Sequence, residues 1–189
     1  MRKLLPDFKD KRVLDLGCGY GWHCIYAMEH GASSVVGVDI SHKMLEVAKE
    51  KTHFPQVEYK CCAIEDVEFP EESFDVILSS LAFHYVADYE ILVKKIYRIL
   101  KSGGKLVFTV EHPVFTAYGT QDWHYNEKGE ILHFPVDNYY YEGKRTAVFL
   151  GEKVTKYHRT LTTYLNTLLS NGFITVSYTH LRAHETLSD

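Results

Sequence analysis

The chain of 189 residues is long enough to bury one sizeable core, and its content of 46% hydrophobic and 24% charged residues is that of an ordinary globular protein. A formal net charge of −4 argues against nucleic acid as a partner, since that would require a basic face. No apolar run approaches the roughly 20 residues that span a bilayer, and the four cysteines follow no disulfide spacing. We therefore expect a cytoplasmic protein with no membrane partner, whose oligomeric state the sequence leaves open.

Short apolar runs alternate with helical patterns through the first half of the chain. We expect five strands, at residues 12–17, 33–40, 57–64, 73–80 and 105–110. We expect three helices between them, at residues 22–30, 41–51 and 88–101. Strands that are apolar on both faces and alternate with helices predict a parallel sheet covered on both sides. The expected fold class is therefore α/β, a three-layer, doubly wound, Rossmann-like and mostly parallel sheet, with a ligand crevice at the carboxyl ends of its strands.

An insertion rich in aromatic residues interrupts this alternation at residues 111–157, after the fifth strand. Two extended runs in it, 133–141 and 144–150, flank a Glu-Gly turn and could pair as a hairpin. An insertion of this length is typical of a lid or binding loop, although it could also serve as a hydrophobic cover for the sheet edge. A helix is expected next, at residues 160–172, followed by a sixth strand that begins at Phe173.

The first strand runs into the turn "DLGCGYG", residues 15–21. Glycines at such a turn let the backbone bend sharply and approach a ligand closely, with the N-terminus of the next helix facing it. The dinucleotide fingerprint fails, because Trp22 stands where its third glycine is required, and no phosphate-binding Gly-Lys-Ser/Thr follows. Asp15 would repel a pyrophosphate but would suit a ligand that carries positive charge.

The second strand ends in another acid, Asp39. A carboxylate at this strand end can accept both hydroxyl groups of a ribose. Asp39 could instead be an acid at the N-terminus of the helix that follows. Asp15 and Asp39, at the ends of adjacent strands with a glycine turn between them, indicate a nucleoside with a cationic extension.

Four segments of this half resemble the successive motifs of one family. They are "VLDLGCGYG", "VVGVDIS", "FDVILSSLAFHYV" and "IYRILKSGGKLVFT", and they look like the motifs of class I S-adenosylmethionine-dependent methyltransferases of the small-molecule, type 11 kind. The likeness spans residues 12–110, about half of the chain. It implies S-adenosyl-L-methionine as the cofactor and transfer of its methyl group to a small-molecule acceptor by direct displacement.

The resemblance also implies a cofactor site. Its members would be Asp15, Gly17, Cys18, Gly19, Gly21, Asp39, Ile40, Ala63, Ile64 and Ser79. In the family, the glycines form the turn beneath the methionine part of the cofactor, Asp15 would sit near the amino group, and a strand-end carbonyl at Ser79 would also take that group. Asp39 would hold the ribose.

The adenine end of this implied site departs from the family pattern. Ile40 would pack on the adenine, and Ala63 and Ile64 would contact its edge. The family often has an acid at the Ala63 position to accept from the adenine amino group, which alanine cannot do. Either Glu65 or Asp66 substitutes for it, or only the backbone N–H of Ile64 reads the base.

Three histidines are candidates for the catalytic base that an acceptor would need if it must lose a proton. His84 follows the fourth strand and His112 the fifth, so both lie at the crevice end, and His158 returns from the insertion. Each could equally be a histidine that hydrogen-bonds a loop. No pair of histidines has a chelating spacing, so we expect no metal site.

Two alternatives remain beside the methyltransferase. One is another nucleoside-binding Rossmann protein, such as a nicotinamide-dependent oxidoreductase, against which the glycine spacing argues. The other is a protein that binds the cofactor but has lost transfer activity. Methylation of nucleic-acid bases is disfavoured because "SSLAFHYV" lacks the Asn/Asp-Pro-Pro-aromatic signature. The acceptor, and whether oxygen, nitrogen or carbon is methylated, stay open.

The last residues, "VSYTHLRAHETLSD", have neither a strand nor a helix period. Their amino-acid sequence resembles a translated sequencing-library adapter of the transposase type. We therefore expect a methyltransferase domain at residues 1–175 and a non-native tail at 176–189. A genuine disordered tail is the alternative. Since nothing after the expected sixth strand has a strand pattern, we expect the family's final antiparallel strand, the seventh, to be missing from this chain.

Overall fold

The structure is a computed structural model that describes residues 4–118, 120–149 and 151–177. The described chain forms two compact units. The first consists of residues 4–83 and 88–110, and the second of residues 84–87 together with the described residues from 111 onward. The boundary between residues 110 and 111 coincides with the start of the expected insertion.

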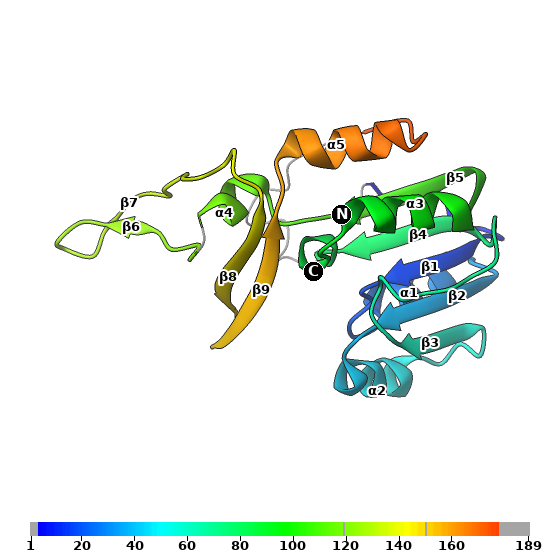
Figure 1. The fold of residues 1–189 in the computed structure, drawn as a ribbon. Coiled ribbons are helices and arrows are strands. Elements are labelled where there is room, and N and C mark those ends of the chain that lie inside the picture. The colour runs from blue at the N-terminus through cyan, green and yellow to red at the C-terminus, as the bar shows by residue number, and fades with distance from the viewer. Residues whose placement is uncertain (1–3, 119, 150, 178–189) are drawn as a thin grey trace. The chain divides into compact units, whose positions relative to one another are not determined.

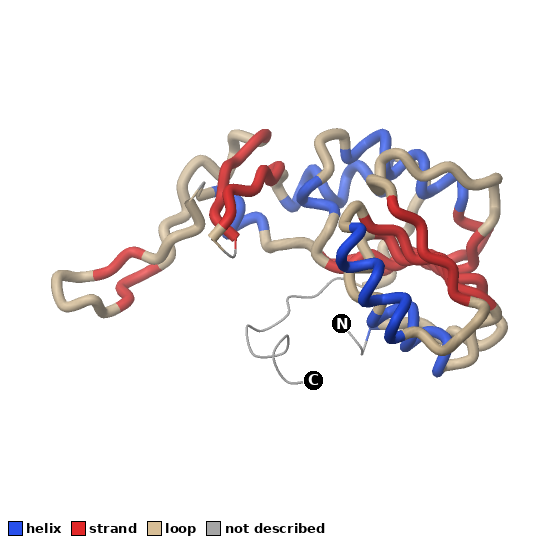
Figure 2. Tube along the Cα trace, turned by 90° about the horizontal axis from the view of Figure 1, so that it is seen from below, coloured by secondary structure: helices blue, strands red, loops and turns tan. Residues whose placement is uncertain are grey.

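The first unit is built on a parallel sheet of five strands in the order β3-β2-β1-β4-β5 (Figure 1). The strands are β1 (Arg12–Leu16), β2 (Ser34–Asp39), β3 (Val57–Cys61), β4 (Phe74–Ser80) and β5 (Leu100–Thr109). The connecting helices are α1 (Trp22–Glu29), α2 (His42–Lys51) and α3 (Tyr89–Ile99), and Figure 2 shows helices on both sides of the sheet. The strand order reverses between β1 and β4, which is where sheets of this kind bind their ligands.

The expected strands and helices of this half are confirmed, except that β5 begins at Leu100, inside the expected helix 88–101, and that β3 ends at Cys61 rather than at residue 64. Local chemistry explains where the helices begin. Ser41 caps α2 by accepting the Met44 N–H on its hydroxyl oxygen at 3.3 Å. Asp88 caps α3 in the same way, accepting the Ile91 N–H at 2.9 Å. The apolar stripe of α3 is buried against the sheet. Its members are Tyr89, Leu92, Val93, Ile96 and Ile99.

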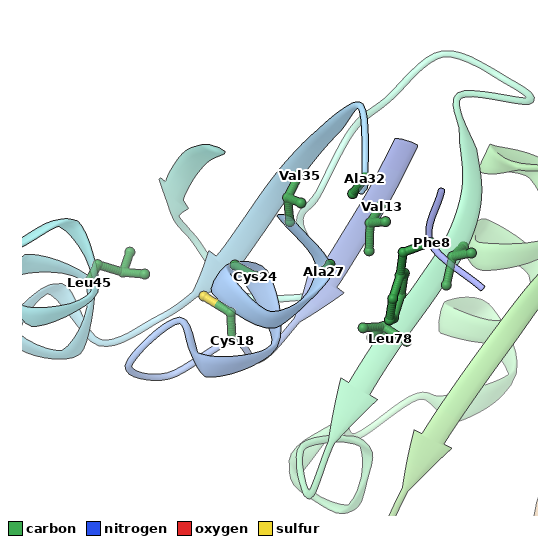
Figure 3. Close-up of a cluster of buried hydrophobic side chains, with 10 residues drawn as sticks. Phe8, Val13, Cys18, Cys24, Ala27, Ala32, Val35, Leu45 and Leu78 are labelled. Carbon is green, nitrogen blue, oxygen red and sulfur yellow. The ribbon is translucent and has the colours of Figure 1, made fainter. Parts of the chain in front are cut away.

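A buried cluster anchors the turn after β1 to the core (Figure 3). Cys18, in the glycine turn, and Cys24, on α1, are both buried in it as free thiols. Phe8, from the segment before β1, is 2% exposed and belongs to the same cluster. Close packing here fixes the path of the glycine turn, because displacing Cys18 would open a cavity.

The described residues of the second unit form two antiparallel hairpins, two α-helices and most of a short 3-10 helix. Its elements are the short helix η2 (Phe83–Tyr85), most of which belongs to this unit, α4 (Pro113–Ala117), β6 (His124–Tyr125), β7 (Ile131–His133), β8 (Gly143–Phe149), β9 (Glu152–His158) and α5 (Leu161–Ser170). The strands pair as β6 with β7 and β8 with β9. The expected helix at 160–172 is confirmed as α5, with Thr160 as its cap at 3.2 Å from the Thr163 nitrogen.

The hairpin expected between residues 133–141 and 144–150 is wrong. Residues 143–149 pair instead with β9, from Gly143 opposite His158 to Phe149 opposite Glu152. Pro135 cannot donate to a ladder, so the run 133–141 cannot pair along its length. Gly151, with a φ of +84°, lies in the turn that closes the observed hairpin.

The sixth strand expected from Phe173 does not form within the described residues. Residues 173–177 are irregular, and Ile174 and Val176 are 86% and 95% exposed. A strand needs a ladder partner, and the described part of the chain offers this segment none. Residues 178–189, most of the expected non-native tail, lie outside the described residues.

Candidate functional site

The turn after β1 has a backbone that favours glycine at all three of its glycine positions, since Gly19 also has a positive φ, +52°. Gly17 and Gly21 have φ values of +78° and +75°. A Cβ atom at Gly17 would lie 2.5 Å from the Cβ atom of Ala82, and one at Gly21 would lie 2.2 Å from the hydroxyl oxygen of Tyr59. At Gly19 the nearest atom would be the Met44 sulfur, 3.9 Å away. The turn is therefore packed from behind at both ends and open at its middle.

Asp39, at the end of β2, is hydrogen-bonded to this turn. Its Oδ2 accepts the backbone N–H of Gly19 at 2.8 Å, and its Oδ1 accepts that of Ser41 at 2.8 Å. The carboxylate is half-buried, and each oxygen retains a second lone pair. Asp39 thus joins the glycine turn to the start of α2 and can still accept from the hydroxyl groups of a ligand.

Asp15 lies on β1 beside β2, in register with Gly37. Its side chain has no exposed surface. Oδ2 accepts the Cys24 S–H at 3.6 Å, whereas Oδ1 has no hydrogen-bond partner among the described residues. Burial raises the pKa of Asp15 to about 7. A buried carboxyl group with an unused oxygen fits a ligand that brings positive charge to this strand end.

The adenine end expected from the family lies where β2 and β3 finish. Ile40 is 74% exposed, which offers an apolar surface to a flat ring beside Asp39. The Cys62 N–H donates to the Asp39 carbonyl at 3.1 Å and ties the two strand ends together. Ala63 is half-buried and Ile64 buried in the turn that follows.

Ser79, near the end of β4, completes the set from the fourth strand. Its buried hydroxyl group donates to the Leu16 carbonyl at 2.8 Å, across the switch from β4 to β1. The ten residues of the expected cofactor site therefore lie at, or just past, the carboxyl ends of β1, β2, β3 and β4. One further residue has no sequence signal, because it lies in mid-strand: Tyr59 of β3, whose hydroxyl group bonds to Thr52 at 2.8 Å and fills the space beside Gly21.

The three candidate catalytic histidines belong to the second unit, and each makes a structural hydrogen bond. The Nδ1 atom of His84 accepts the Glu111 N–H at 3.4 Å, and burial lowers the pKa of His84 to about 4. His112 caps α4, with its Nδ1 accepting the Val114 N–H at 3.2 Å.

His158 is wholly buried and both of its ring nitrogens are engaged. Its Nε2 donates to the Tyr139 carbonyl at 2.8 Å, and its Nδ1 therefore accepts the Thr116 hydroxyl proton at 2.8 Å. Burial lowers the pKa of His158 below its usual value. Of the three, His158 is the most fully committed to holding the fold.

Sequence reasoning missed three polar residues that form a cluster with His84, to which Glu111 connects them. Glu111 accepts from Lys156 at 2.5 Å and from Gln121 at 2.9 Å, and its Oε1 lies 3.9 Å from the Nε2 atom of His84. The one available signal was position, since Glu111 comes directly after the expected fifth strand. Lys156 and Gln121 lie 45 and 10 residues away from it in sequence, so only the fold reveals the cluster.

The residues that the structure describes show neither a membrane-spanning helix nor a cluster of metal-ligating side chains. None of their helices is long and apolar enough to cross a membrane. No three of their histidine, cysteine or acidic side chains form a group that could hold a metal ion.

Comparison with known proteins gives a consistent set of relatives. A family model described as a methyltransferase domain matches residues 14–108. A crystal structure from Mesorhizobium loti, described as an S-adenosylmethionine-dependent methyltransferase, is 40% identical with a TM-score of 0.84, covering 92% of this chain and 78% of that one. A structure from Listeria monocytogenes, described as a candidate enzyme of the same kind, is 58% identical with a TM-score of 0.87, covering 90% and 80%.

A curated relative with a named activity matches over a shorter stretch. It is a ubiquinone biosynthesis O-methyltransferase from Coxiella burnetii, 36% identical over 112 residues, which are 58% of this chain and 47% of the relative. The chain thus spans about half the length of this relative.

Proposed function

The chain belongs to the class I S-adenosylmethionine-dependent methyltransferases, and on that premise we propose that it methylates a small-molecule acceptor by direct displacement. The observation that carries the proposal is the Gly19–Asp39 hydrogen bond beside an open glycine turn. This arrangement places two features at the carboxyl ends of the strands: a carboxylate that can accept hydrogen bonds from a ribose, and a backbone that a ligand can approach closely. A net charge of −4 supports a small molecule rather than nucleic acid as the acceptor.

The residues present fit the cofactor. Asp39 would hold the ribose hydroxyl groups, Ile40 would pack on the adenine, and the unpartnered Oδ1 of Asp15 would favour the positive charge of the methionine part. Gly19 would let the backbone approach this part closely. When bound, S-adenosyl-L-methionine supplies a methyl group on a positively charged sulfur, which makes the leaving group a good one.

The work left to the protein is then mostly alignment of the acceptor. We assign acceptor binding to the stretch 111–157, whose aromatic side chains suit a flat or apolar molecule. An acceptor that must lose a proton also needs a base, and His84 and His112 are candidates on their positions after the fourth and fifth strands, each once its Nδ1 atom releases the backbone N–H that it accepts. His158 is a third candidate, but it could act only if it released one of its two hydrogen bonds.

We also propose that the protein is located in the cytoplasm. The four cysteines are free thiols in the described structure, which suits the reducing cytoplasm.

Thermal unfolding with and without S-adenosylhomocysteine, with NAD as the control, tests the cofactor half of the proposal. Ligand binding to the native state at a hundred times its Kd adds about 2.7 kcal/mol of stability and raises the Tm. We expect S-adenosylhomocysteine to raise the Tm and NAD to leave it unchanged. A cooperative transition that neither ligand moves, or that NAD alone moves, would contradict the proposal.

Turnover tests the transfer half. Production of S-adenosylhomocysteine is measured against a panel of hydroxyl, amine and carbon acceptors. Acceptor-dependent product is expected from an enzyme. A chain that binds the cofactor but yields no product with any of them would instead be the inactive cofactor-binding protein.

A further inference from the structure

Strand β9 carries charge on the face that it buries. Side chains alternate along a strand, so Lys156 and His158 point to the same side, and they are 3% and 0% exposed. Burying a lysine is costly unless a partner compensates its charge. Glu111 compensates it, with 2.5 Å between the Lys156 Nζ atom and Oε1 of Glu111.

A second polar side chain fixes the orientation of the Glu111 carboxylate. Gln121 donates its amide N–H to Oε2 at 2.9 Å and accepts a proton of Lys156 on its own oxygen at 2.9 Å. Among the described residues, each carboxylate oxygen of Glu111 therefore receives one hydrogen-bond donor. Each also retains a lone pair, so the ionised carboxylate is held in place and can accept one more hydrogen bond.

The ring of His84 lies beside the Glu111 carboxylate. Because the Glu111 N–H donates to Nδ1, the proton of the neutral ring lies on Nε2, which faces Oε1 at 3.9 Å. The low pKa of His84, caused first by burial, keeps the ring neutral near pH 7. His84 is 1% exposed, whereas the Glu111 side chain is 26% exposed. Glu111, like the half-buried Gln121, is thus a part of the cluster that solvent reaches.

Stabilisation of the fold does not explain this cluster well, because apolar side chains of similar volume often stabilise a fold as well as a buried ion pair does. Two residues of the cluster lie shortly after strands in the sequence. His84 comes four residues after Ser80 of β4, and Glu111 comes two residues after Thr109 of β5. In sheets of this topology, ligands bind beyond the carboxyl ends of strands.

We propose that Glu111, held by Lys156 and Gln121, binds the methyl acceptor by accepting a hydrogen bond from a neutral hydroxyl or amine group. The inference rests on the proposed function and names the acceptor class. Cationic acceptors are disfavoured by Lys156 and by Arg159, which donates to the Ala87 carbonyl at 2.8 Å. An acceptor whose reacting group is itself anionic has no hydrogen there to donate and would be repelled by the carboxylate of Glu111. Tyr85, 39% exposed with its ring 4.4 Å from that of His84, offers a surface for a ring.

The test uses three ring probes that differ in charge: phenol, benzoate and benzylamine, the last a cation at pH 7.5. Their binding to the full chain, saturated with S-adenosylhomocysteine, is followed by ligand-observed NMR. We expect phenol to bind more tightly than either charged probe. Glu111→Gln should weaken phenol binding roughly tenfold, which is about 1.4 kcal/mol, because the new amide group presents N–H to Lys156 or to the ligand.

The matched control is Glu130→Gln, in the same unit, where the exposed Glu130 accepts from Asn126. It should leave phenol binding unchanged. Lys156→Met tests the positioning role by a change in selectivity, since removing that cation should narrow the preference for phenol over benzylamine. A merely structural lysine would not alter this ratio. If Glu111→Gln does not fold, Glu111→Asp, which keeps the charge and retracts it, should retain the preference with weaker binding.

Several results would overturn the inference. They are no phenol binding to the unsubstituted chain, benzoate or benzylamine binding as tightly as phenol, and an unchanged phenol affinity in folded Glu111→Gln. The Kd of S-adenosylhomocysteine, measured in the same samples, separates this failure from that of the proposed function. If that Kd is intact while phenol fails, only the acceptor assignment is lost.

Discussion

The backbone N–H of Gly19 donates to Oδ2 of Asp39 at 2.8 Å, so the acid assigned to the ribose also holds the glycine turn. The two roles are coupled, because the same carboxylate fixes the loop that approaches the cofactor. The second oxygen of Asp39 accepts the Ser41 N–H and positions the start of α2. One side chain thereby joins three parts of the cofactor site.

Asp39→Asn should weaken S-adenosylhomocysteine binding by roughly tenfold to a hundredfold, since hydrogen bonds to a charged group contribute about 1.5–3 kcal/mol. Isothermal titration calorimetry measures the Kd. Glu46→Gln, an exposed acid on α2, is the control and should bind as the unsubstituted chain does. Equal affinities of the two variants would remove Asp39 from the cofactor site.

Gly17→Ala should destabilise the fold more than Gly103→Ala. Both glycines have a positive φ, +78° and +73°, so both substitutions carry a similar backbone cost of about 1–2 kcal/mol. Only at Gly17 would the new methyl group meet a neighbour, the Cβ atom of Ala82 at 2.5 Å, whereas nothing lies within 4 Å at Gly103. Overpacking of this kind adds about 1–3 kcal/mol. Urea unfolding measures the difference, and equal midpoints would contradict the tight packing behind the turn.

The burial of Asp15 should make stability fall as pH rises. Its pKa is raised from 3.8 to about 7 in the fold, so between these values the native state binds more protons than the unfolded chain. Stability from this group is therefore present at low pH and is lost as pH approaches 7, by roughly 4 kcal/mol in all.

The measurement is the free energy of unfolding of Asp15→Asn relative to the unsubstituted chain at pH 5 and pH 8. The difference should favour the variant more at pH 8, because asparagine has no charge to bury. S-adenosylhomocysteine should offset part of the loss in the unsubstituted chain alone, since its ammonium group favours the ionised acid. A pH-independent difference would show that Asp15 titrates normally.

His84 should produce the opposite dependence. Its pKa falls from 6.5 to about 4 in the fold, so between these values the unfolded chain binds more protons. Stability is then present above pH 6.5 and is lost as pH falls towards 4, by up to about 3 kcal/mol. His84→Asn keeps an acceptor for the Glu111 N–H and removes the titration. Its free energy of unfolding should lose less between pH 7 and pH 4.5, and an identical loss would contradict the burial of a neutral ring.

Much of the cofactor site could be read from the sequence because its chemistry is local. The glycines of residues 17–21 and the acids that end the first two strands are recognisable by spacing, and parallel strands bring their carboxyl ends to one edge. Tyr59 could not be found in this way. Its contact with Gly21 depends on how β3 and α1 pack, which no short-range pattern encodes.

The second unit was predicted less well, for reasons visible in particular residues. The run 144–150 has the alternation of a strand, but alternation does not determine which strand it pairs with. The run 133–141, which precedes it in sequence, cannot pair along its length because it contains Pro135. The run from Phe173 is apolar enough for a strand, yet a strand forms only where a ladder partner exists. Histidines drew attention by residue type, whereas Glu111 became notable only through Lys156 and Gln121.

By itself, the sequence determined the order of strands and helices, the α/β class and the nucleoside-binding turn, because periodicity and glycine spacing act over a few residues. Only the tertiary structure decided which polar groups are buried and which partners they have. Within the part of the chain that the structure describes, it left Oδ1 of Asp15 without a hydrogen-bond partner, gave both nitrogens of His158 a partner, and paired Lys156 with Glu111. The physical reason is that desolvation and hydrogen bonding depend on neighbours distant in sequence, and these set the charge state and the accessibility of each group.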